Sequence, residues 1–520
     1  MGDFMKNFNN VLITLISGLT KTVIIMILIY VQIEFVKIEV QESKHLLIYL
    51  NFAVELLKVI LVIHIIYKFQ SVSYKLLWII LIMFFPILGA ILYLMLGNSE
   101  VSKSFKKRID EEYSNSQQFI EKNDEELEEI KKIDKVRYNQ VNYIYNTNKL
   151  PIYKSPNLQY LKSGEEYFES ILKDIANARE YIFIQYFTIS EGSMWNRLFD
   201  ILKQKSLENV KIYIIVDGMG NQGKFPKDFK QKLEKFEIKF YIFNSSLISI
   251  NEYLNYRSHR KIVVIDGNIA YTGGVNIGDE YINLDKRYGH WKDSGIKILG
   301  SAVTSYIIMF IRMWNLRDKK SWLDYKKFIN RKSKEDIGKG YIVPYCDSPD
   351  NKNNTAQNLY IQIINSAKDY VYIMTPYLSL DCDIVTAFAN AAKSGVDVRI
   401  IIPSISDKLV MHFVNRAFYQ ILLEAGVKIY EYKPGFIHSK VFISDDELAT
   451  VGSINLDFRG LYFHFECGNW IYKTGEEEKI KQDFLDTLEQ SLEINLIEWN
   501  RRGIIKRIID KIIVTFSPLV

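Results

Sequence analysis

Cysteine is scarce in this chain, and neither sign of charge dominates. Its 520 residues contain only three cysteines, far apart and odd in number, which excludes a disulfide framework and a cysteine-rich zinc cluster. The formal net charge is only +5, an excess too small to indicate a nucleic-acid partner. We therefore expect a reducing compartment, and any basic patch must be local.

Disorder is also excluded by the composition. Hydrophobic residues make up 48% of the chain and charged residues 24%, which is typical of globular proteins. At this length we expect about two to four domains. The sequence is rich in one further feature, long apolar segments near its start.

Two of these apolar segments have the length of a transmembrane helix. The segment 76–96 (LLWIILIMFFPILGAILYLML) has no charged residue, and about 20 apolar residues suffice to cross a bilayer. The segment 46–67 is similar in length but carries Glu55, Lys58 and His64. Glu55 and Lys58 can neutralise each other on one helix face. We predict a hairpin of two membrane-spanning helices.

A third apolar segment, 11–33, is interrupted by Lys21. It fits a further span, a signal-anchor segment or an interfacial helix. We therefore predict that residues 1–98 form a membrane anchor of two or three transmembrane helices. The alternative, buried helices of a soluble domain, is opposed by the uncharged last segment.

Basic residues come directly after the last apolar segment: Lys103, Lys106, Lys107 and Arg108. The positive-inside rule keeps such a cluster in the cytoplasm, together with the rest of the chain. Residues 99–149 are rich in glutamate and lysine, with apolar residues at helical spacing: Ile120, Leu127, Ile130 and Ile133. We interpret this region as an amphipathic linker, a solvated stalk between the anchor and the rest of the chain.

From about residue 150 onward, short apolar runs alternate with helical periodicity, as in α/β folds. Predicted strands at 181–187 (YIFIQYF) and 210–216 (VKIYIIV) occupy the same relative places as 369–374 (DYVYIM) and 396–402 (VDVRIII). The simplest account is an internal duplication. We predict a first half at 150–335 and a second half at 336–495.

Each half carries the same five residues at the same offsets. The first set lies in HRKIVVIDGNIAYTGGVN and comprises His259, Lys261, Asp266, Gly273 and Asn276. The second set lies in HSKVFISDDELATVGSIN and comprises His438, Lys440, Asp445, Gly452 and Asn455. Five fixed residues recur by chance on the order of once in a few million starting points. The remaining histidines lack this repetition, and His464 is the nearest to an exception.

Strand alternation would place each histidine and its lysine on one face of a strand. If the two halves meet about a pseudo-twofold axis, two imidazoles, two ammonium groups and two amides surround one phosphate. That constellation is a phosphodiester site that requires no metal ion.

These paired motifs resemble those of the phospholipase D superfamily, and the surrounding sequence resembles its cardiolipin synthase branch. Nearly the whole chain takes part in this resemblance. Its marks include GGVN after the first motif, GSIN after the second, Trp291 with Asp293, and Thr375-Pro376-Tyr377. Ser294-Gly295 stands where that family often has Thr-His. The resemblance implies an α/β class with a duplicated phospholipase D fold, two α/β/α sandwich halves, preceded by transmembrane helices.

The resemblance also implies a two-step transfer through a covalent phosphohistidine. We expect His259 to be the nucleophile and His438 the general acid and base. Four residues would bind phosphoryl oxygens, supported by Ser453: Lys261, Lys440, Asn276 and Asn455. Asp266 and Asp445 would orient structure, and Glu280 and Glu466 would each orient an imidazole. No metal ion and no cofactor is implied.

The substrate implied by the resemblance is phosphatidylglycerol, two molecules of which would give cardiolipin and glycerol. We expect a multi-pass protein of the cell membrane with its catalytic region on the cytoplasmic face, in contact with anionic lipid. No protein partner is indicated. The alternatives are a phospholipase D hydrolase, a transphosphatidylase using another alcohol, a nuclease, and an inactive membrane scaffold. The apolar span opposes a nuclease, and two intact motifs oppose a scaffold.

Two further regions have a basic and apolar character. Residues 496–520 form a predicted basic amphipathic helix with an isoleucine repeat from Ile504 to Ile513. That helix fits either the membrane interface or the protein's own core. A basic run between the halves extends from Arg312 to Lys332 and includes Trp314 and Trp322. It fits either a lipid-facing patch or a solvated face.

Overall fold

The computed structural model of the chain describes residues 45–68, 70–97, 101–244, 255–317, 321–329, 336–351 and 353–519. It divides into two compact units, Met1–Ser99 and Glu100–Val520. The predicted segment 11–33 lies outside the described residues, as do Lys319, Lys320, Arg331 and Lys332 of the central basic run.

The described part of the first unit is helical. It consists of α2 (His45–Tyr67), α3 (Val72–Phe84), α4 (Pro86–Leu92) and a π-helical turn η1 (Tyr93–Gly97). The helix predicted at 46–67 is confirmed by α2. None of the helices in the described part of the chain combines the length and the apolar character that crossing a bilayer requires.

The prediction of one unbroken helix over 76–96 is wrong, because the chain reverses at Phe85. Pro86 has no amide hydrogen, and its ring clashes with the preceding turn, so α3 ends at Phe84 and α4 begins at the proline. The Tyr74 hydroxyl then donates to the Leu96 carbonyl oxygen over 3.3 Å. In a continuous helix these residues would stand roughly 33 Å apart.

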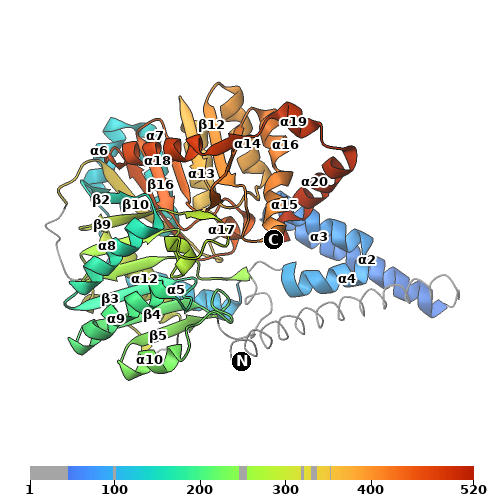
Figure 1. Ribbon diagram of the computed structural model, residues 1–520. Coiled ribbons are helices and arrows are strands. Elements are labelled where there is room, and N and C mark those ends of the chain that lie inside the picture. Colours follow the sequence, from blue (N-terminus) through green and yellow to red (C-terminus); the bar gives the residue numbers. More distant parts are fainter. Residues whose placement is uncertain are drawn as a thin grey trace, which may run out of the picture. The chain divides into compact units, whose positions relative to one another are not determined.

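The second unit is built on two large mixed β-sheets (Figure 1). The first sheet has the strand order β2-β9-β7-β6-β3-β4-β5. Its strands are β2 (Asn157–Leu161), β3 (Tyr181–Tyr186), β4 (Lys211–Asp217), β5 (Lys239–Phe243), β6 (Ile262–Ile265), β7 (Ile269–Gly273) and β9 (Gly295–Leu299). Its helices are α8 (Gly164–Ala176), α9 (Ser193–Leu207), α10 (Phe229–Lys235) and α12 (Val303–Asn315).

The second sheet has the order β1-β10-β17-β16-β15-β11-β12-β13-β18. Its strands are β1 (Tyr153–Lys154), β10 (Tyr341–Asp347), β11 (Tyr370–Met374), β12 (Asp397–Pro403), β13 (Lys428–Tyr432), β15 (Val441–Ser444), β16 (Leu448–Gly452), β17 (Glu466–Tyr472) and β18 (Ser491–Glu493). Its helices are α13 (Thr355–Ser366), α14 (Cys382–Lys393), α15 (Leu409–Ala417), α16 (Tyr419–Ala425), α17 (Phe458–Tyr462), α18 (Glu476–Glu489), α19 (Leu496–Asn500) and α20 (Ile504–Phe516).

The two sheets repeat one topology. The run β10-β17-β16-β15-β11-β12-β13 matches the whole first sheet strand for strand. The directions match too: β3-β4-β5 and β11-β12-β13 are parallel, and the other neighbours in the matched run are antiparallel. The duplication inferred from the motifs is therefore a duplication of the α/β fold.

Both faces of the central strands are covered, and β6 (IVVI) is therefore apolar throughout. In β6, Val263 and Ile265 lie in one apolar cluster, and Ile262 and Val264 lie in the other, as the alternation of strand side chains requires. The second cluster also contains β11, α12 and α18. One apolar core thus joins the two halves on the side of the sheets that α12 and α18 cover.

The region 99–149 is not the solvated stalk that its composition suggested. It forms α5 (Lys103–Gln117), α6 (Asp124–Ile133) and α7 (Lys135–Asn148), and it belongs to the second unit. The predicted apolar face is confirmed at Leu127 and Ile130, which are buried, whereas Ile133 is 52% exposed and Ile120 lies between α5 and α6. The helices have a partner, however: α5 packs on α12, and α7 packs on α13 and β10. The first half also begins late, because β1 pairs with β10 of the second sheet.

The central basic run is mixed where it is described: Arg312 and Trp314 are buried, Arg317 is half-buried, and Trp322, Lys326 and Lys327 are exposed. Arg312 is buried, donates to the Ser116 hydroxyl over 2.8 Å and stacks on the Tyr113 ring. Trp314 is buried as well, and its indole N–H donates to the Ser321 carbonyl oxygen. Arg312 thereby fastens α12 to α5. Both interpretations of the run, as a lipid-facing patch or as a solvated face, fail at Arg312 and Trp314 and stay predictions for the exposed Lys326 and Lys327.

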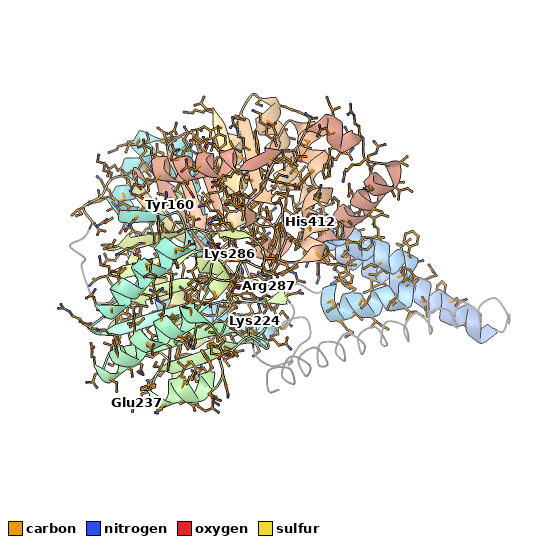
Figure 2. The ribbon with its side chains drawn as sticks, in the orientation of Figure 1. Tyr160, Lys224, Glu237, Lys286, Arg287 and His412 are labelled. Atoms are coloured by element: carbon orange, nitrogen blue, oxygen red, sulfur yellow. The ribbon has the colours of Figure 1, made fainter. Side chains whose placement is uncertain are left out.

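A buried ion pair also connects the halves. The Lys292 Nζ atom of strand β8 (His290–Lys292) donates to both Asp483 carboxylate oxygens of α18 over 2.8 Å. Tyr160, labelled in Figure 2, donates its hydroxyl to the same carboxylate over 2.8 Å. Asp483 therefore collects a cation and a hydroxyl from the first half.

We predict that Asp483→Asn destabilises the catalytic unit by about 3 to 5 kcal/mol, because it leaves the Lys292 charge buried without a counter-charge. Thermal unfolding of the full chain in detergent measures this. The matched control is Glu128→Gln at an exposed helix pair with Lys131, which should leave the midpoint unchanged. An unchanged midpoint for Asp483→Asn contradicts this role for the pair.

Candidate active site

Each histidine motif is held in place by the opposite half of the chain. Strand β14 (Gly435–Ile437), just before His438, pairs in parallel with β8 of the first half. Likewise Ser258, just before His259, forms a parallel bridge with Phe465 of the second half. The His438 amide donates to the Lys292 carbonyl oxygen over 2.7 Å, and the His259 amide to the Phe465 carbonyl oxygen over 2.9 Å. The site is thus assembled by two exchanged segments.

A carboxylate comes after each of these partner segments and contacts the imidazole of the other half. His438 Nδ1 lies 2.6 Å from Asp293 Oδ2, in a hydrogen bond. His259 Nδ1 lies 2.8 Å from Glu466 Oε1, an ion-pair distance without a hydrogen bond's alignment. Both contacts engage Nδ1 and leave Nε2 of each imidazole for a substrate. Glu466 was predicted to orient an imidazole, and this geometry agrees with that role.

Asp293, rather than Glu280, stands beside the second imidazole. Glu280 lies on the short helix η2 (Asp279–Ile282), and burial raises the pKa of its carboxyl group. The prediction that Glu280 orients an imidazole is therefore not met. The sequence does contain a sign of this residue, the Trp-x-Asp pattern of Trp291 and Asp293. The pattern was used above only as a mark of the family resemblance, with no role assigned to Asp293.

The motifs GGVN and GSIN differ at their second residue, which is Gly274 in the first and Ser453 in the second. The contacts of this residue explain the difference. A Cβ on Gly274 would lie 2.1 Å from Asp293 Oδ1, so only glycine lets this short carboxylate approach. At the matching place, Ser453 donates its hydroxyl to Glu466 Oε2. Ser453 therefore holds the Glu466 carboxylate, and its predicted support of phosphoryl binding stays a prediction.

The two lysines of the motifs are buried beside the histidines. Lys261 Nζ donates to the His259 carbonyl oxygen over 2.8 Å, and Lys440 Nζ donates to the His438 carbonyl oxygen. Burial lowers the pKa of Lys261 to about 7 and that of Lys440 to about 8. Burial, and then the charges of the lysines, also lower the pKa values of both imidazoles.

These pKa shifts share one main cause, burial away from solvent, and the charges of the two lysines add to the lowering at the imidazoles. His259 and His438 are each only 6% exposed, and burial disfavours every charged form. Burial likewise raises the pKa of Asp293 to about 6. An anion bound between the lysines would stabilise their charged forms, so the site is electrostatically complementary to a phosphodiester.

The two motif asparagines differ in the hydrogen bonds that their side chains already form within the protein. Asn276 donates its amide to the Tyr281 hydroxyl over 2.7 Å and accepts from the Thr188 amide over 3.2 Å. Asn455 is also buried, but its Oδ1 atom has no hydrogen-bond partner within the described residues. The structure therefore leaves the Asn455 side chain freer to meet a ligand.

Asp266 and Asp445 lie at the far ends of their strands and do not reach the imidazoles. The Asp266 carboxylate accepts from the amides of Arg179, Glu180 and Tyr181 over 2.7 to 2.9 Å. Asp445 repeats this with the amides of residues 368, 369 and 370 over 2.9 to 3.0 Å. Each aspartate ties the start of the neighbouring strand, β3 or β11, so the expectation of a structural role agrees with the geometry.

Aromatic rings that the sequence did not single out surround the imidazoles. The Phe187 ring centroid lies 5.0 Å from His259, and those of Tyr281 and Trp291 lie 5.4 Å from His438. These rings leave little room for water at the histidines.

His464 stands closer to the site than any other histidine without a repeat. Its ring centroid lies 5.6 Å from that of His259, and its Nδ1 lies 3.6 Å from Glu466 Oε1. Burial lowers the pKa of His464 to about 4. Donor atoms of His259, His464 and Glu466 lie within 4.8 Å of one another, close enough to hold a metal ion. A metal ion bound there would coordinate the imidazole of His259, the residue that is expected to attack phosphorus.

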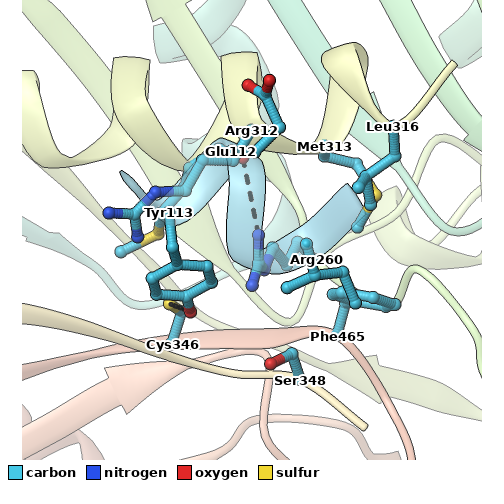
Figure 3. A pocket seen from close by; sticks show the side chains of 11 residues that line it. Glu112, Tyr113, Arg260, Arg312, Met313, Leu316, Cys346, Ser348 and Phe465 are labelled. Atoms are coloured by element: carbon cyan, nitrogen blue, oxygen red, sulfur yellow. Dashed lines mark hydrogen bonds between the residues drawn. The ribbon is translucent and has the colours of Figure 1, made fainter. Parts of the chain in front are cut away.

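A small cavity lies behind the His259 segment, on the side to which Arg260 points (Figure 3). Arg260 donates to the carbonyl oxygens of Glu466 and Asp347 over 3.0 and 3.1 Å. The alternation along the segment sends His259 and Lys261 to the site and Arg260 to its rear. Arg260 thereby fixes the backbone that carries the Glu466 carboxylate.

Two buried imidazoles, each beside a carboxylate, and two buried lysines form an arrangement that suits the transfer of a phosphoryl-linked group. The description of the family model that matches residues 171–309 and 360–490 is "Cardiolipin synthase, PLD-like domain". A second model, "Phospholipase_D-nuclease N-terminal", matches residues 56–98.

Relatives extend this match to most of the chain. "Cardiolipin synthase 2" of Bacillus anthracis is 35% identical over 86% of this chain and 87% of its own length. "Cardiolipin synthase" of Alkalihalophilus pseudofirmus is 32% identical over 85% and 88%. The chain belongs to the cardiolipin synthase family of the phospholipase D superfamily, and it is a phosphatidyltransferase.

Among solved structures, the phosphatidylserine synthase of Haemophilus influenzae matches 74% of this chain and 100% of its own, with a TM-score of 0.57 and 13% identity. This likeness shows a shared fold.

We predict that Gly274→Ala lowers the rate of phosphatidyl transfer by about 10- to 100-fold, because the new methyl group displaces Asp293 from His438. The control is Gly503→Ala, where an added Cβ meets nothing within 4 Å, and it should retain the full rate. Initial rates at equal amounts of folded protein make the comparison. Equal rates for the two variants contradict the proposed positioning of Asp293.

We also predict that inorganic sulfate binds the site more weakly as the pH rises. Sulfate keeps its charge near neutral pH, whereas Lys261 and Lys440 lose theirs as the pH rises through about 7 and 8. Between about pH 6.5 and about pH 8.5 the dissociation constant should rise on the order of tenfold. Calorimetric titration measures it, with Lys440→Gln as the variant that should flatten the pH dependence. A constant affinity in the unmodified chain contradicts the role of the lysines.

Proposed function

We propose that this chain joins two molecules of phosphatidylglycerol into cardiolipin and glycerol, through a phosphatidyl group carried on His259. The observation that carries the proposal is the pairing of each motif histidine with a carboxylate of the opposite half, in one buried cationic site. The family and the names of the relatives support cardiolipin as the product.

The first step forms a bond between His259 Nε2 and phosphorus and breaks the bond from phosphorus to the headgroup glycerol oxygen. His438 gives its proton to that oxygen. The aligned hydrogen bond from His438 to Asp293 supports this division of roles, because a carboxylate on Nδ1 stabilises the imidazolium that must hold the proton. The contact of His259 with Glu466 lacks that alignment.

The second step reverses the first with a new alcohol. His438, now neutral, takes the proton of the terminal hydroxyl of a second phosphatidylglycerol, whose oxygen attacks phosphorus and releases His259. Lys261, Lys440 and Asn455 hold the phosphoryl oxygens while charge develops there. No group other than the chain's own side chains and the two lipids enters this balance.

Transfer rather than hydrolysis requires that water reach the phosphohistidine poorly. The low exposure of both histidines and the rings of Phe187, Tyr281 and Trp291 support exclusion of water. The alternative reaction is hydrolysis, or transfer to a different alcohol, which the same groups can catalyse. The second alternative is an inactive membrane scaffold.

The first unit serves in this proposal as the membrane anchor of a multi-pass protein, with the catalytic unit on the cytoplasmic face. Large apolar side chains on its described helices are exposed, among them Phe52, Ile63 and Phe84. The basic cluster at Lys103 to Arg108 supports the orientation. Phospholipid substrates then reach the catalytic unit without leaving the bilayer.

We predict that the purified full chain in vesicles containing phosphatidylglycerol alone releases one glycerol per cardiolipin formed. His259→Ala and His438→Ala should each lower the rate at least about a thousandfold, since both histidines act in one sequence of steps. Glu128→Gln, at an exposed position of α6, is the control and should retain activity. Mass spectrometry of the lipids and an assay of glycerol give both products.

Accumulation of phosphatidic acid without cardiolipin would contradict the proposal and show that the protein is a phospholipase D hydrolase. The absence of any product from folded protein would favour the scaffold. Cardiolipin formation that survives either alanine variant contradicts the mechanism.

A further inference from the structure

The C-terminal helix α20 turns its isoleucines outward. Ile504, Ile505, Ile508, Ile509 and Ile512 are between 47% and 71% exposed. At 100° per residue these five positions cover one continuous face of the helix. Ile513 and Val514 pack on the core from the other side. Of the two alternatives left open by the sequence, burial of the isoleucine repeat in the protein's own core therefore fails for this face.

Helix α15 enlarges the same apolar surface. It packs beside α20 (Figure 1), and Figure 2 labels His412 on it. Leu409, Val410 and Phe413 lie on one of its faces and are 72%, 56% and 50% exposed. We call the outward faces of α15 and α20 the apolar platform. Two helices with large apolar side chains in water form the kind of patch that marks an interaction surface.

Positive charge accompanies the apolar platform. Residues 496–520 contain five basic residues, Arg501, Arg502, Lys506, Arg507 and Lys511, against two acidic ones, Glu498 and Asp510. Asp510 is paired with Arg502 at 2.6 Å, while Arg501, Lys506 and Lys511 are exposed. Apolar side chains flanked by cations are the composition of helices that lie in the interface of anionic membranes.

The apolar platform is physically connected to the active site. Lys408, at the start of α15, lies 5.3 Å from the centroid of the Tyr377 ring, and Tyr377 donates its hydroxyl to Asp407 over 2.7 Å. The Tyr377 ring also lies near that of Phe436, two residues before His438, with 6.3 Å between the ring centroids.

The other end of the platform has a similar link. Ser379 donates its hydroxyl to the Ser517 carbonyl oxygen at the end of α20 over 3.3 Å. The neighbouring Leu378 bridges to Leu456, the residue after Asn455. Both helices of the platform thus attach to segments that shape the site.

We propose that the apolar platform of α15 and α20 inserts into the interface of an anionic phospholipid bilayer and so brings the active site to its lipid substrates. This inference rests on the proposed function in one respect, that the substrates are bilayer phospholipids. The occupant is lipid rather than protein because the isoleucine face is bordered by exposed cations, and because the platform adjoins a site whose substrates lie in a bilayer.

A fluorescent probe on the full chain tests the occupant directly. Cys346 and Cys467 are buried and Cys382 is exposed, so Cys382→Ser followed by Ile508→Cys gives one reactive thiol for an environment-sensitive nitrobenzoxadiazole label. The matched control is Leu207→Cys on α9, a leucine of similar exposure (70%) that lies outside the apolar platform. Both proteins are reconstituted in vesicles of equal parts phosphatidylcholine and phosphatidylglycerol, with and without a doxyl-labelled lipid as quencher.

We expect the label at position 508 to emit at shorter wavelength and to be quenched by the doxyl lipid, while the label at position 207 stays in water. Equal behaviour at the two positions overturns the proposal. A label at position 508 that is shielded from water but not quenched by lipid also overturns it, because the occupant is then protein, such as the first unit or a second copy.

Activity separates this inference from the proposed function. We expect Ile505→Ser, Ile508→Ser and Ile512→Ser together to raise the vesicle phosphatidylglycerol needed for the half-maximal rate about fivefold or more. The rate with a short-chain, monomeric phosphatidylglycerol should be unchanged. Loss of both rates or of neither counts against the membrane role of the apolar platform, and a chain inactive on every lipid before substitution counts against the proposed function.

Discussion

The hydrogen bond between His438 and Asp293 crosses from one half of the chain to the other, and the contact of His259 with Glu466 crosses back. The parallel pairing of β14 with β8 sets the first of these contacts, and the bridge from Ser258 to Phe465 sets the second. Neither half contains a complete site, so the duplicated fold acts as one enzyme only when the halves are docked.

The docking is made secure by apolar burial and by a few polar contacts that are costly to break. Helices α12 and α18 fill one core that both sheets share. Lys292 pairs with Asp483, and the next residue, Asp293, bonds to His438. Two adjacent residues thus serve the stability of the docking and the chemistry of the site, respectively. Arg260 does the same from behind His259, since it holds the backbone of Glu466. The resulting rigidity keeps two imidazoles and two lysine side chains close together, although burial disfavours the charged form of each.

The sequence predicted the residues of the site that the duplication repeats. Of the two carboxylates, which are not repeated at one spacing, it predicted Glu466 and missed Asp293. His259, Lys261, His438 and Lys440 recur at fixed offsets and meet in one site. The carboxylates do not recur in that way: Glu466 stands 11 residues after Asn455, but Asp293 stands 17 residues after Asn276. The short helix η2 and strand β8 occupy that longer connection. Glu280 follows Asn276 at a short distance, whereas the carboxylate that contacts the imidazole lies farther along the chain. Gly274 is explained only by the atoms that surround it.

Outside the site, hydropathy located helices but not their partners. Pro86 stands inside the segment 76–96, and an average over that segment conceals the reversal that the proline causes. The spacing of Leu127 and Ile130 indicated an apolar face, but only the fold shows that this face lies in the catalytic unit. Hydropathy also could not show which face of α20 packs on the protein. Ile513 and Val514 make that contact, and this leaves the other isoleucines facing outward.

The stoichiometry of the covalent intermediate tests the central claim, that two halves make one site, most directly. Rapid quenching of the full chain with phosphatidylglycerol, followed by mass spectrometry of its peptides, counts the phosphatidyl groups on each chain and locates them. We predict at most one group per chain, carried on His259. Two groups on one chain, with His259 and His438 occupied together, would contradict the account, because each half would then act as a site of its own.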